Sequence, residues 1–432
     1  KLSASRTYDL HLRSSCIRSR LSMEFDLKSL GRDWVEGISG QELVARVISR
    51  AKLIQGQDQL IVVDRTDPHD FTVEFFAAIL AGRSVALANP NWGAQEREEF
   101  NALVGANIAP LDNQSSGANY SNACRQNKVI LIPTGGTTNG LKLAIHTWKT
   151  LETACIRVQQ FLGGAAIDSC CVLPLYHVSG FTQLLRAYHS GGYIRFDEDY
   201  VKGYCLSYVP TQLRRALFDE KRIQALTTTR VIFVGGAPMP KSLAKEAREL
   251  KLPVMPVYGM TETAAMVAAI PVADFLTDSR AGAIPIGDAK MEIDSSGRIR
   301  IQSPALFKGY YGGEALDLTR GYLSGDEGYI DETERLHISG RIDRLVISGG
   351  EKIDPHEVED AVGAISGIKE VLAVGLPDVE WGQKLVVYYT GQELVDWKKH
   401  LKDQLMNYKL PKEMLRVDHL PLDEKGKFLR PS

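Results

Sequence analysis

The sequence predicts an α/β protein: a large N-terminal domain of layered α/β sheets with a small antiparallel β subdomain, followed by a small mobile α+β C-terminal domain. Three observations predict this organisation. The chain has 432 residues, which is too many for one hydrophobic core. Before Gly259, apolar runs alternate with helical patterns, which indicates parallel strand–helix–strand units. The pattern changes to short segments and turns at Gly282, and it changes again after Arg344.

Helices and buried strands are expected to alternate through the first part of the chain. In the first helix, Leu43, Val47 and Ile48 recur at the spacing of one helical face. Buried strands are expected where four or five apolar residues run together between turn residues. A polar loop rich in Ser, Gly and Asn is expected at residues 112–122. The expected helices span residues 40–51, 71–80, 96–104 and 147–161, and the expected strands span 59–63, 84–88, 129–132, 169–173, 231–234 and 254–259.

Beyond Gly282 the sequence predicts antiparallel β-structure, because apolar and polar residues alternate in short segments (291–294, 299–302 and 336–338). A new helix is expected to begin after Asp354, an N-cap that is followed by a proline and by acids in the first turn. Two strands (371–374 and 385–389) and a helix at 394–405 then complete a unit of about 90 residues. The expected boundary lies at 341–344, which gives domains at 25–341 and 342–432.

The composition argues against several classes of function. With 51 basic and 53 acidic residues the formal net charge is −2, so there is no electrostatic basis for binding nucleic acid or an anionic membrane. No apolar stretch approaches the ~18 residues that a membrane span needs. The six cysteines form no C-x-x-C pair, which argues against a zinc site or a disulfide framework and fits a reducing cytoplasm.

Residues 1–24 are expected to form an N-terminal arm outside the folded domains. Residues 1–22 hold five Lys/Arg, six Ser and one acid, Asp9. This composition superficially matches an organelle transit peptide, so organelle targeting stays open beside a cytoplasmic location. We favour the alternatives, an extension ahead of Met23 or a polar arm, because chain ends are often disordered.

A segment rich in glycine and threonine follows the strand expected at 129–132. Glycines let backbone N–H groups turn inward, threonine hydroxyls add donors, and Lys142 adds a positive charge, so the segment has the parts of a phosphate-binding loop. It is not the common P-loop, because Lys142 follows no glycine and precedes no Ser or Thr. A polar turn is the alternative. The candidate phosphate ligands are Thr134, Gly135, Gly136, Thr137, Thr138 and Lys142.

Four further motifs follow this loop in a fixed order: Tyr258–Thr263, Tyr322–Asp326, the pair of segments 340–344 and 348–353, and Gly426-Lys427. In this order and spacing the five motifs resemble those of the acyl-adenylate-forming superfamily, which comprises acyl-CoA synthetases, luciferases and peptide-synthetase adenylation domains. The resemblance covers residues 35–432. A single short motif would be weak evidence, whereas five in register are specific.

The resemblance implies an enzyme that uses ATP, Mg²⁺ and CoA. The carboxylate of an acid would attack the α-phosphorus of ATP, pyrophosphate would leave, and the acyl-AMP would pass its acyl group to a thiol. For Asp326 or Arg341 alone, a surface salt bridge would be the simpler interpretation. The implied roles are β/γ-phosphate binding for Thr134–Lys142, adenine binding for Tyr258 and Gly259, α-phosphate binding for Thr261, Mg²⁺ ligation for Glu262, ribose binding for Asp326 and Arg341, and charge neutralisation at the carboxylate and α-phosphate for Lys427.

Domain motion is also expected. Hinges are a few positions at the ends of elements, and Asp343 lies between Arg341 and the glycine pair Gly349-Gly350. We therefore expect Asp343 to be the hinge. In the second domain arrangement the loop with Gly349 and Gly350 would line the tunnel for the thiol.

Three segments near strand ends are candidates for the acid pocket. His177 lies just past an expected strand, where α/β proteins place ligands, and the superfamily carries a histidine in a matching segment; a lone histidine is more often structural. Glycines at a strand end let adenine or a flat acyl group approach the backbone. An arginine fork could hold a second carboxylate, although adjacent arginines usually form a solvated face. The remaining candidates are Gly235, Gly236 and Ala237 in the second segment, and Arg214 and Arg215 in the third.

The segments IPTGGTT, AIHTW, LPLYHVSGF and SYVPTQL resemble o-succinylbenzoate–CoA ligases of menaquinone and phylloquinone synthesis, with the cyanobacterial type closest. This resemblance implies an aromatic dicarboxylate as the substrate, with Arg215 as the first and Arg214 as the second candidate for its ring carboxylate. The expected partners are small molecules, and a homodimer is left open. The alternatives are a CoA ligase for another aromatic or fatty acid, and a nucleotide-binding protein without catalysis.

The phosphate loop departs from the usual superfamily pattern at four positions. Gly135 replaces a serine, Asn139 a glycine, Leu141 a proline and Leu143 a glycine. Loss of a hydroxyl and of a rigid proline would weaken control of pyrophosphate. Because asparagine tolerates the left-handed backbone conformation, the loop can still form, and we expect an active enzyme.

Overall fold

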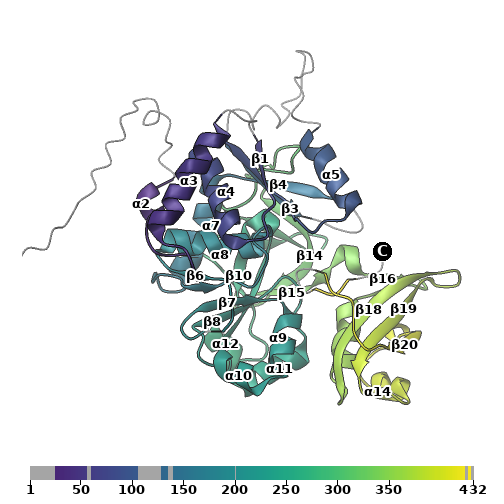
Figure 1. Ribbon diagram of the computed structural model, residues 1–432. Coiled ribbons are helices and arrows are strands. Elements are labelled where there is room, and N and C mark those ends of the chain that lie inside the picture. Colours follow the sequence, from purple (N-terminus) through teal and green to yellow (C-terminus); the bar gives the residue numbers. More distant parts are fainter. Residues whose placement is uncertain are drawn as a thin grey trace, which may run out of the picture.

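The computed structural model describes residues 25–55, 60–105, 128–134, 140–199, 201–423 and 427–429. Figure 1 shows a large body of sheets and helices and, beside it, a small domain drawn in yellow-green. The expected N-terminal arm, the loop at 112–122 and four candidate phosphate ligands (Gly135, Gly136, Thr137 and Thr138) lie outside the described residues.

The first sheet carries the phosphate-loop hairpin. Its strand order is β1-β2-β3-β4, with β1 to β3 parallel and β4 returning antiparallel to β3. Thr134 at the end of β3 lies opposite Lys142 at the start of β4, so the two ends of the loop are fixed side by side. The strands are β1 (Leu60–Val63), β2 (Ser84–Leu87), β3 (Ile130–Thr134) and β4 (Lys142–His146), and the helices of this region are α2 (Leu27–Leu30), α3 (Gly40–Ile54), α4 (Pro68–Leu80) and α5 (Ala94–Gly105).

The expected helices begin at recognisable caps. The Asp67 side chain accepts the N–H of Asp70 at 2.8 Å, and Pro68 follows it at the first helical position of α4. Thr147 and Thr150 cap α7 (Trp148–Phe161) reciprocally. Such caps satisfy N–H groups that a helix cannot bond internally. The helix expected at 71–80 therefore begins three residues earlier, at Pro68, where the cap of Asp67 sets its start.

The second sheet has seven strands in the order β11-β10-β9-β8-β7-β5-β6, and the five from β6 to β9 are parallel. Parallel strands end at one edge, so the loops after β5, β7, β8 and β9 meet there. The expected strand at 169–173 pairs only at Ser169 and Cys170. The strands are β5 (Ser169–Cys170), β6 (Ile194–Arg195), β7 (Cys205–Tyr208), β8 (Val231–Val234), β9 (Val254–Met260), β10 (Ala265–Ala269) and β11 (Ile284–Pro285), and the helices are α8 (Val178–Ser190), α9 (Pro210–Ala216), α10 (Glu220–Leu226), α11 (Lys241–Glu249) and α12 (Val272–Thr277).

The small antiparallel sheet follows as expected. Its order is β12-β13-β14-β15, and its pairing places Asp326 directly opposite Arg341. Two motifs that are separated in the sequence are thus joined by strand register. The strands are β12 (Lys290–Ile293), β13 (Arg298–Gln302), β14 (Tyr322–Ile330) and β15 (Leu336–Arg341).

The C-terminal domain has a hydrophobic core of its own, whose buried members run from Val346 to Leu405. Asp354 caps α13 (Pro355–Gly363), as its sequence predicts. The final helix, α14 (Trp397–Lys402), is shorter than expected because Asp396 before it adopts a left-handed conformation (φ 54°). The strands are β16 (Val346–Ser348), β17 (Glu351–Ile353), β18 (Ile368–Asp378), β19 (Gly382–Gly391) and β20 (Glu413–Arg416).

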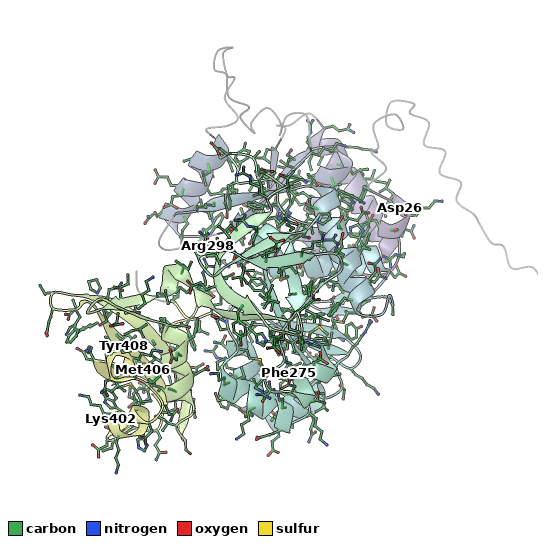
Figure 2. The ribbon with its side chains drawn as sticks, turned by 180° about the vertical axis from the view of Figure 1, so that it is seen from behind. Asp26, Phe275, Arg298, Lys402, Met406 and Tyr408 are labelled. Atoms are coloured by element: carbon green, nitrogen blue, oxygen red, sulfur yellow. The ribbon has the colours of Figure 1, made fainter. Side chains whose placement is uncertain are left out.

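Hydrogen bonds and ion pairs join the two domains at α9 and α11. The backbone N–H of Lys241 on α11 donates to Asp360 on α13 at 3.0 Å, and Arg215 on α9 pairs with Glu370 on β18 at 3.5 Å. Figure 2 shows Lys402, Met406 and Tyr408 on the small domain, apart from Phe275 and Arg298 on the large one. Among the described residues, no helix has the length and apolar character needed to cross a membrane.

Candidate active site

The base of the phosphate loop lies beside Thr261 and Glu262 of the Tyr258–Thr263 motif, which we call the Thr-Glu turn. The Thr134 hydroxyl is 3.5 Å from Oε1 of Glu262, although the two residues are 128 positions apart in the sequence. The Lys142 ammonium stands 5.3 Å from the ring centre of Tyr310. The described ends of the loop, Thr134 and Lys142, are therefore brought to the acid expected to ligate Mg²⁺.

Thr261 and Glu262 lie in a one-turn 3₁₀ helix, η1 (Thr261–Thr263), directly after β9. The Glu262 side chain is buried, with the residue 6% exposed, and its Oε1 accepts a 2.6 Å hydrogen bond from the Tyr310 hydroxyl. Burial, together with the charge of Glu262, raises the pKa of Tyr310. The Nε2 of His146 contacts the Thr261 carbonyl at 2.8 Å, and burial lowers the pKa of His146 to about 4, so the neutral imidazole donates there.

The backbone after this turn is strained. Ala264 and Ala265 have φ angles of 54° and 76°, in the left-handed region that residues with a Cβ rarely adopt. Such conformations persist only where the surrounding structure imposes them, and they gather at functional sites. These angles turn the chain back into β10, which pairs with β9, so Thr261 and Glu262 lie in the turn that joins the two strands.

Tyr258, Asp326 and Arg341 form one connected group. The Tyr258 hydroxyl donates to Oδ2 of Asp326 at 2.8 Å, and Nη1 of Arg341 lies 3.4 Å from Oδ1 of the same carboxylate. Asp326 is 6% exposed, which makes these donors necessary. Burial and the Asp326 charge both raise the pKa of Tyr258. The Asp326 carboxylate can accept hydrogen bonds from the hydroxyls of a sugar while Tyr258 and Arg341 hold it in place.

Lys427 of the small domain lies against the glycine turn after β8. A Cβ atom built on Gly236 would stand 3.1 Å from Nζ of Lys427, and Gly236 has a φ of 79°. Gly235 is equally constrained, because a Cβ there would meet Cγ2 of Val257 at 2.6 Å. A hairpin bridge between Leu422 and Phe428 presents the lysine. The missing side chain of Gly236 therefore leaves room for Lys427, and that of Gly235 leaves room for Val257.

His177 is the N-cap residue of α8 and is 7% exposed, with its ring packed on Tyr176 at 4.7 Å between centres. It lies in the loop after β5, at the edge where the other loops meet. The fold thus places His177 where the sequence predicts, and its contact with substrate stays a prediction.

The arrangement of α9 gives both arginines of the expected pair other partners, and their contact with substrate stays a prediction. Arg214 pairs with Glu246 and donates to the Ser242 hydroxyl at 3.1 Å, so it faces α11. Arg215 is half exposed and pairs with Glu370 of the small domain. Both guanidinium groups already have acidic partners at the helix surface, because they lie on a helix and not at the open end of a strand.

Sequence reasoning missed Arg186, a buried arginine on α8. It is 3% exposed, its Nε donates to the Thr182 carbonyl at 3.1 Å, and its guanidinium carbon lies 5.4 Å from the Phe233 ring centre. Burial lowers its pKa, and within the described part of the chain no carboxylate pairs with it. The sequence holds one cue, because Arg186 is the single Lys or Arg in α8 and lies between Leu185 and Ala187.

Tyr310 and His146 were also missed. His146, at the end of β4, contacts the Thr261 carbonyl. Tyr310, in the segment that pairs with β4, contacts the Glu262 carboxylate. Neither carries a motif signature, and their roles depend on pairing between distant segments. Only the fold could reveal them.

The hinge and tunnel candidates occupy the connection to the small domain. Asp343 lies in the 3₁₀ turn η2 (Ile342–Arg344) between β15 and β16. Gly349 and Gly350 form the turn between β16 and β17, with φ angles of 61° and 85°. A Cβ on Gly349 would stand 3.0 Å from the Trp381 ring, so this turn needs glycine for space as well as for conformation.

A cavity of about 650 Å³ lies elsewhere, between α9 and the ends of β18, β19 and β20. Arg215, Phe218, Lys369 and Arg416 are among the residues that line it. None of the motif residues does. We regard it as a crevice between the domains, because the convergence of the motifs lies at a different place.

The fold and the site together define an AMP-binding enzyme. Residues 108–311 match the family model for the AMP-binding enzyme, and residues 357–427 match the model for the AMP-binding enzyme C-terminal domain. The 2-succinylbenzoate–CoA ligase of Lactococcus lactis is 31% identical over 321 residues, which are 70% of this chain and 69% of that protein. The corresponding ligase of Listeria monocytogenes is 30% identical and covers 69% and 68%. The chain belongs to this family of ligases.

Solved structures support the fold. The o-succinylbenzoate–CoA synthetase of Bacillus subtilis, in complex with the acyl-adenylate OSB-AMP, matches with a TM-score of 0.74 at 24% identity, over 92% of this chain and 93% of that one. ATP-bound MatB of Rhodopseudomonas palustris matches with a TM-score of 0.76 at 22% identity, over 91% and 93%. At these identities the structural likeness establishes the two-part architecture.

Proposed function

We propose that this chain is an ATP-dependent acid–thiol ligase that activates o-succinylbenzoate as the acyl-AMP and then transfers the acyl group to CoA. In the first step the carboxylate attacks the α-phosphorus of ATP and pyrophosphate leaves. In the second step the CoA thiolate attacks the acyl carbonyl and AMP leaves. The observation that carries the proposal is the convergence of Lys427 on Gly236, because it brings a cation of the small domain to the edge where the other motifs meet.

The chain positions substrates and neutralises charge, since the reacting atoms belong to the substrates. We assign adenine to Tyr258 with the glycine turn, ribose to Asp326 and Arg341, and the α-phosphate to Thr261. Lys427 would stabilise the charge that accumulates as carboxylate and phosphate meet. His177 would line the pocket for the acid. The β- and γ-phosphates would be held by the loop from Thr134 to Lys142, which includes Gly135, Gly136, Thr137 and Thr138.

Glu262 fits a magnesium ligand. It is a buried carboxylate with hydroxyl donors but, among the described residues, no pairing cation. The described residues also contain no group of three or more acids, histidines or cysteines that could hold a metal ion alone. A hard cation held by one carboxylate and by substrate phosphates suits such a site. When bound, Mg²⁺ would neutralise phosphate charge.

We assign the second carboxylate of the substrate to Arg186 in place of Arg214 and Arg215. A buried guanidinium without an acid is costly, and an aromatic carboxylate would supply the missing charge. Arg186 packs on Phe233 of β8, two residues before Gly235 and three before Gly236, which contacts Lys427. A substrate lying between Lys427 and Arg186 would present one carboxylate to each.

The thiol step needs a second arrangement of the small domain. We propose that the domains meet at residues 341–342, that Asp343 is the hinge, and that Gly349 and Gly350 line the thiol tunnel. ATP and CoA as co-substrates make the cytoplasm the proposed location. Residues 1–22 bear on neither proposal.

One assay separates the candidate functions. The chain would be supplied with ATP, Mg²⁺ and a panel of acids, and AMP release would be measured with and without CoA. We expect CoA-dependent AMP release with o-succinylbenzoate and much less with fatty or cinnamic acids. Preference for another acid would favour the alternative ligase. ATP–pyrophosphate exchange with none of the acids would favour a nucleotide-binding protein without catalysis.

A further inference from the structure

The segment that holds Tyr310 is fixed between the phosphate-loop hairpin and the Thr-Glu turn. Its backbone pairs with β4: Ile145 N–H donates to the Gly309 carbonyl at 3.0 Å, and Lys308 N–H donates to the Ile145 carbonyl at 2.7 Å. Phe307 N–H donates to the Glu262 carbonyl at 2.9 Å. Gly309 is required here, because a Cβ would meet the Glu314 carbonyl at 2.6 Å.

The Tyr310 side chain continues this connection. Its hydroxyl donates to Glu262 Oε1 at 2.6 Å, while the Tyr322 hydroxyl lies 3.3 Å away on the other side. The ring packs edge-on against Phe307, and the Lys142 ammonium stands over its face. Both ends of this tyrosine are therefore held, and one of its contacts reaches the phosphate loop.

Glu262 depends on this hydroxyl more than on any other described donor. The Thr134 hydroxyl is at 3.5 Å, the limit of a hydrogen bond, whereas the Tyr310 contact is short and charge-assisted. Among the described residues, no lysine or arginine pairs with Glu262. The orientation of the Glu262 carboxylate is therefore fixed, but its charge is not neutralised. Such a carboxylate can bind a cation that arrives together with the nucleotide.

We propose that Tyr310 is a positioning residue that aims the Glu262 carboxylate at the metal of the magnesium–nucleotide complex. This inference rests on the proposed function, in which Glu262 is the metal ligand. Removing the hydroxyl frees the carboxylate to rotate and leaves Oε1 without its short donor. The affinity for nucleotide should then fall only when the metal is present.

The test compares Tyr310→Phe with Tyr329→Phe, a control that deletes the hydroxyl of an exposed tyrosine on β14, away from Glu262. Calorimetry would measure the Kd of a non-hydrolysable ATP analogue with Mg²⁺ and with EDTA. Tyr310→Phe is expected to weaken binding about tenfold with Mg²⁺, the scale of one charge-assisted hydrogen bond, and not at all with EDTA. Tyr329→Phe is expected to bind as the wild type does.

Several outcomes would overturn the inference. Equal Mg²⁺ dependence in wild type and Tyr310→Phe would do so, as would equal effects of the two variants. A Tyr310→Phe chain that fails to fold would also do so, because the hydroxyl would then serve the fold. In a Glu262→Gln background, Tyr310→Phe should add no further loss. If the wild type itself bound no nucleotide, the proposed function would fail instead.

Discussion

The Lys427 side chain occupies the space beside Gly236, where an added Cβ would stand 3.0 Å from Cε and 3.1 Å from Nζ. The two residues belong to different domains, so their contact depends on how the domains are arranged. Other contacts between the domains include the ion pairs of Arg215 and Lys241, whose side chains are exposed. Exposed ion pairs contribute little to stability, so these two would oppose a rearrangement of the small domain only weakly.

Lys427→Ala should slow acyl-AMP formation by a factor on the order of 10²–10³, the usual effect of removing one charge-stabilising donor. Conversion of supplied acyl-AMP to the thioester should remain largely intact, because the lysine would have left the site by then. Single-turnover measurements of each half-reaction check this. Lys402→Ala, on α14 of the same domain, is the control. Equal losses in both half-reactions would remove the role assigned to Lys427.

Asp343→Pro should make the two half-reactions lose rate unequally. Residue 343 lies in a 3₁₀ turn. Proline fixes φ near −65°, within the range of about −50° to −70° that is typical of 3₁₀ helices, so we expect the present arrangement to be retained. Adenylation should therefore survive better than thioester formation. Asp343→Ala, which leaves the backbone free, is the matched control. Equal losses, or none, would place the hinge elsewhere.

Local sequence patterns predicted the helices and strands well because caps and apolar runs depend on interactions between residues that are close in the sequence. The cap at Asp354 and the apolar run at 231–234 appear in the structure where the sequence places them. The motif residues Asp326 and Arg341 meet because strand register joins them. Arg214 and Arg215 could not be oriented, since their partners come from another helix and another domain.

The residues missed by the sequence share one physical cause. Tyr310 acts on Glu262 through the pairing of a distant segment with β4, which no periodicity reports. Arg186 stands alone in its helix, but only the fold reveals that, among the described residues, no carboxylate pairs with it. Contacts of this kind require the complete fold, whereas caps and strands require only neighbours in sequence.

Stability should fall as pH decreases from about 6.5 to about 4. Burial lowers the pKa of His146 and of His189 to about 4 from an ordinary 6.5. In this window the unfolded chain binds more protons, so the free energy of unfolding decreases by about 1.4 kcal/mol per pH unit for each histidine. Urea unfolding at several pH values measures the slope. His189→Gln should reduce the slope by one histidine's share, and an unchanged slope would contradict this.

Arg186→Leu should raise KM for o-succinylbenzoate by a factor equivalent to about 2–5 kcal/mol, the usual cost of removing one partner of a buried charge pair. A monocarboxylate analogue without the ring acid should be affected far less, because it has no charge for Arg186 to pair with. Steady-state kinetics with both acids supply the comparison. Arg214→Leu and Arg215→Leu are the matched controls, since each removes an arginine that already has a glutamate partner. If either control discriminated between the two acids while Arg186→Leu did not, the ring carboxylate would lie at α9, and the pocket proposed around Phe233 would be wrong.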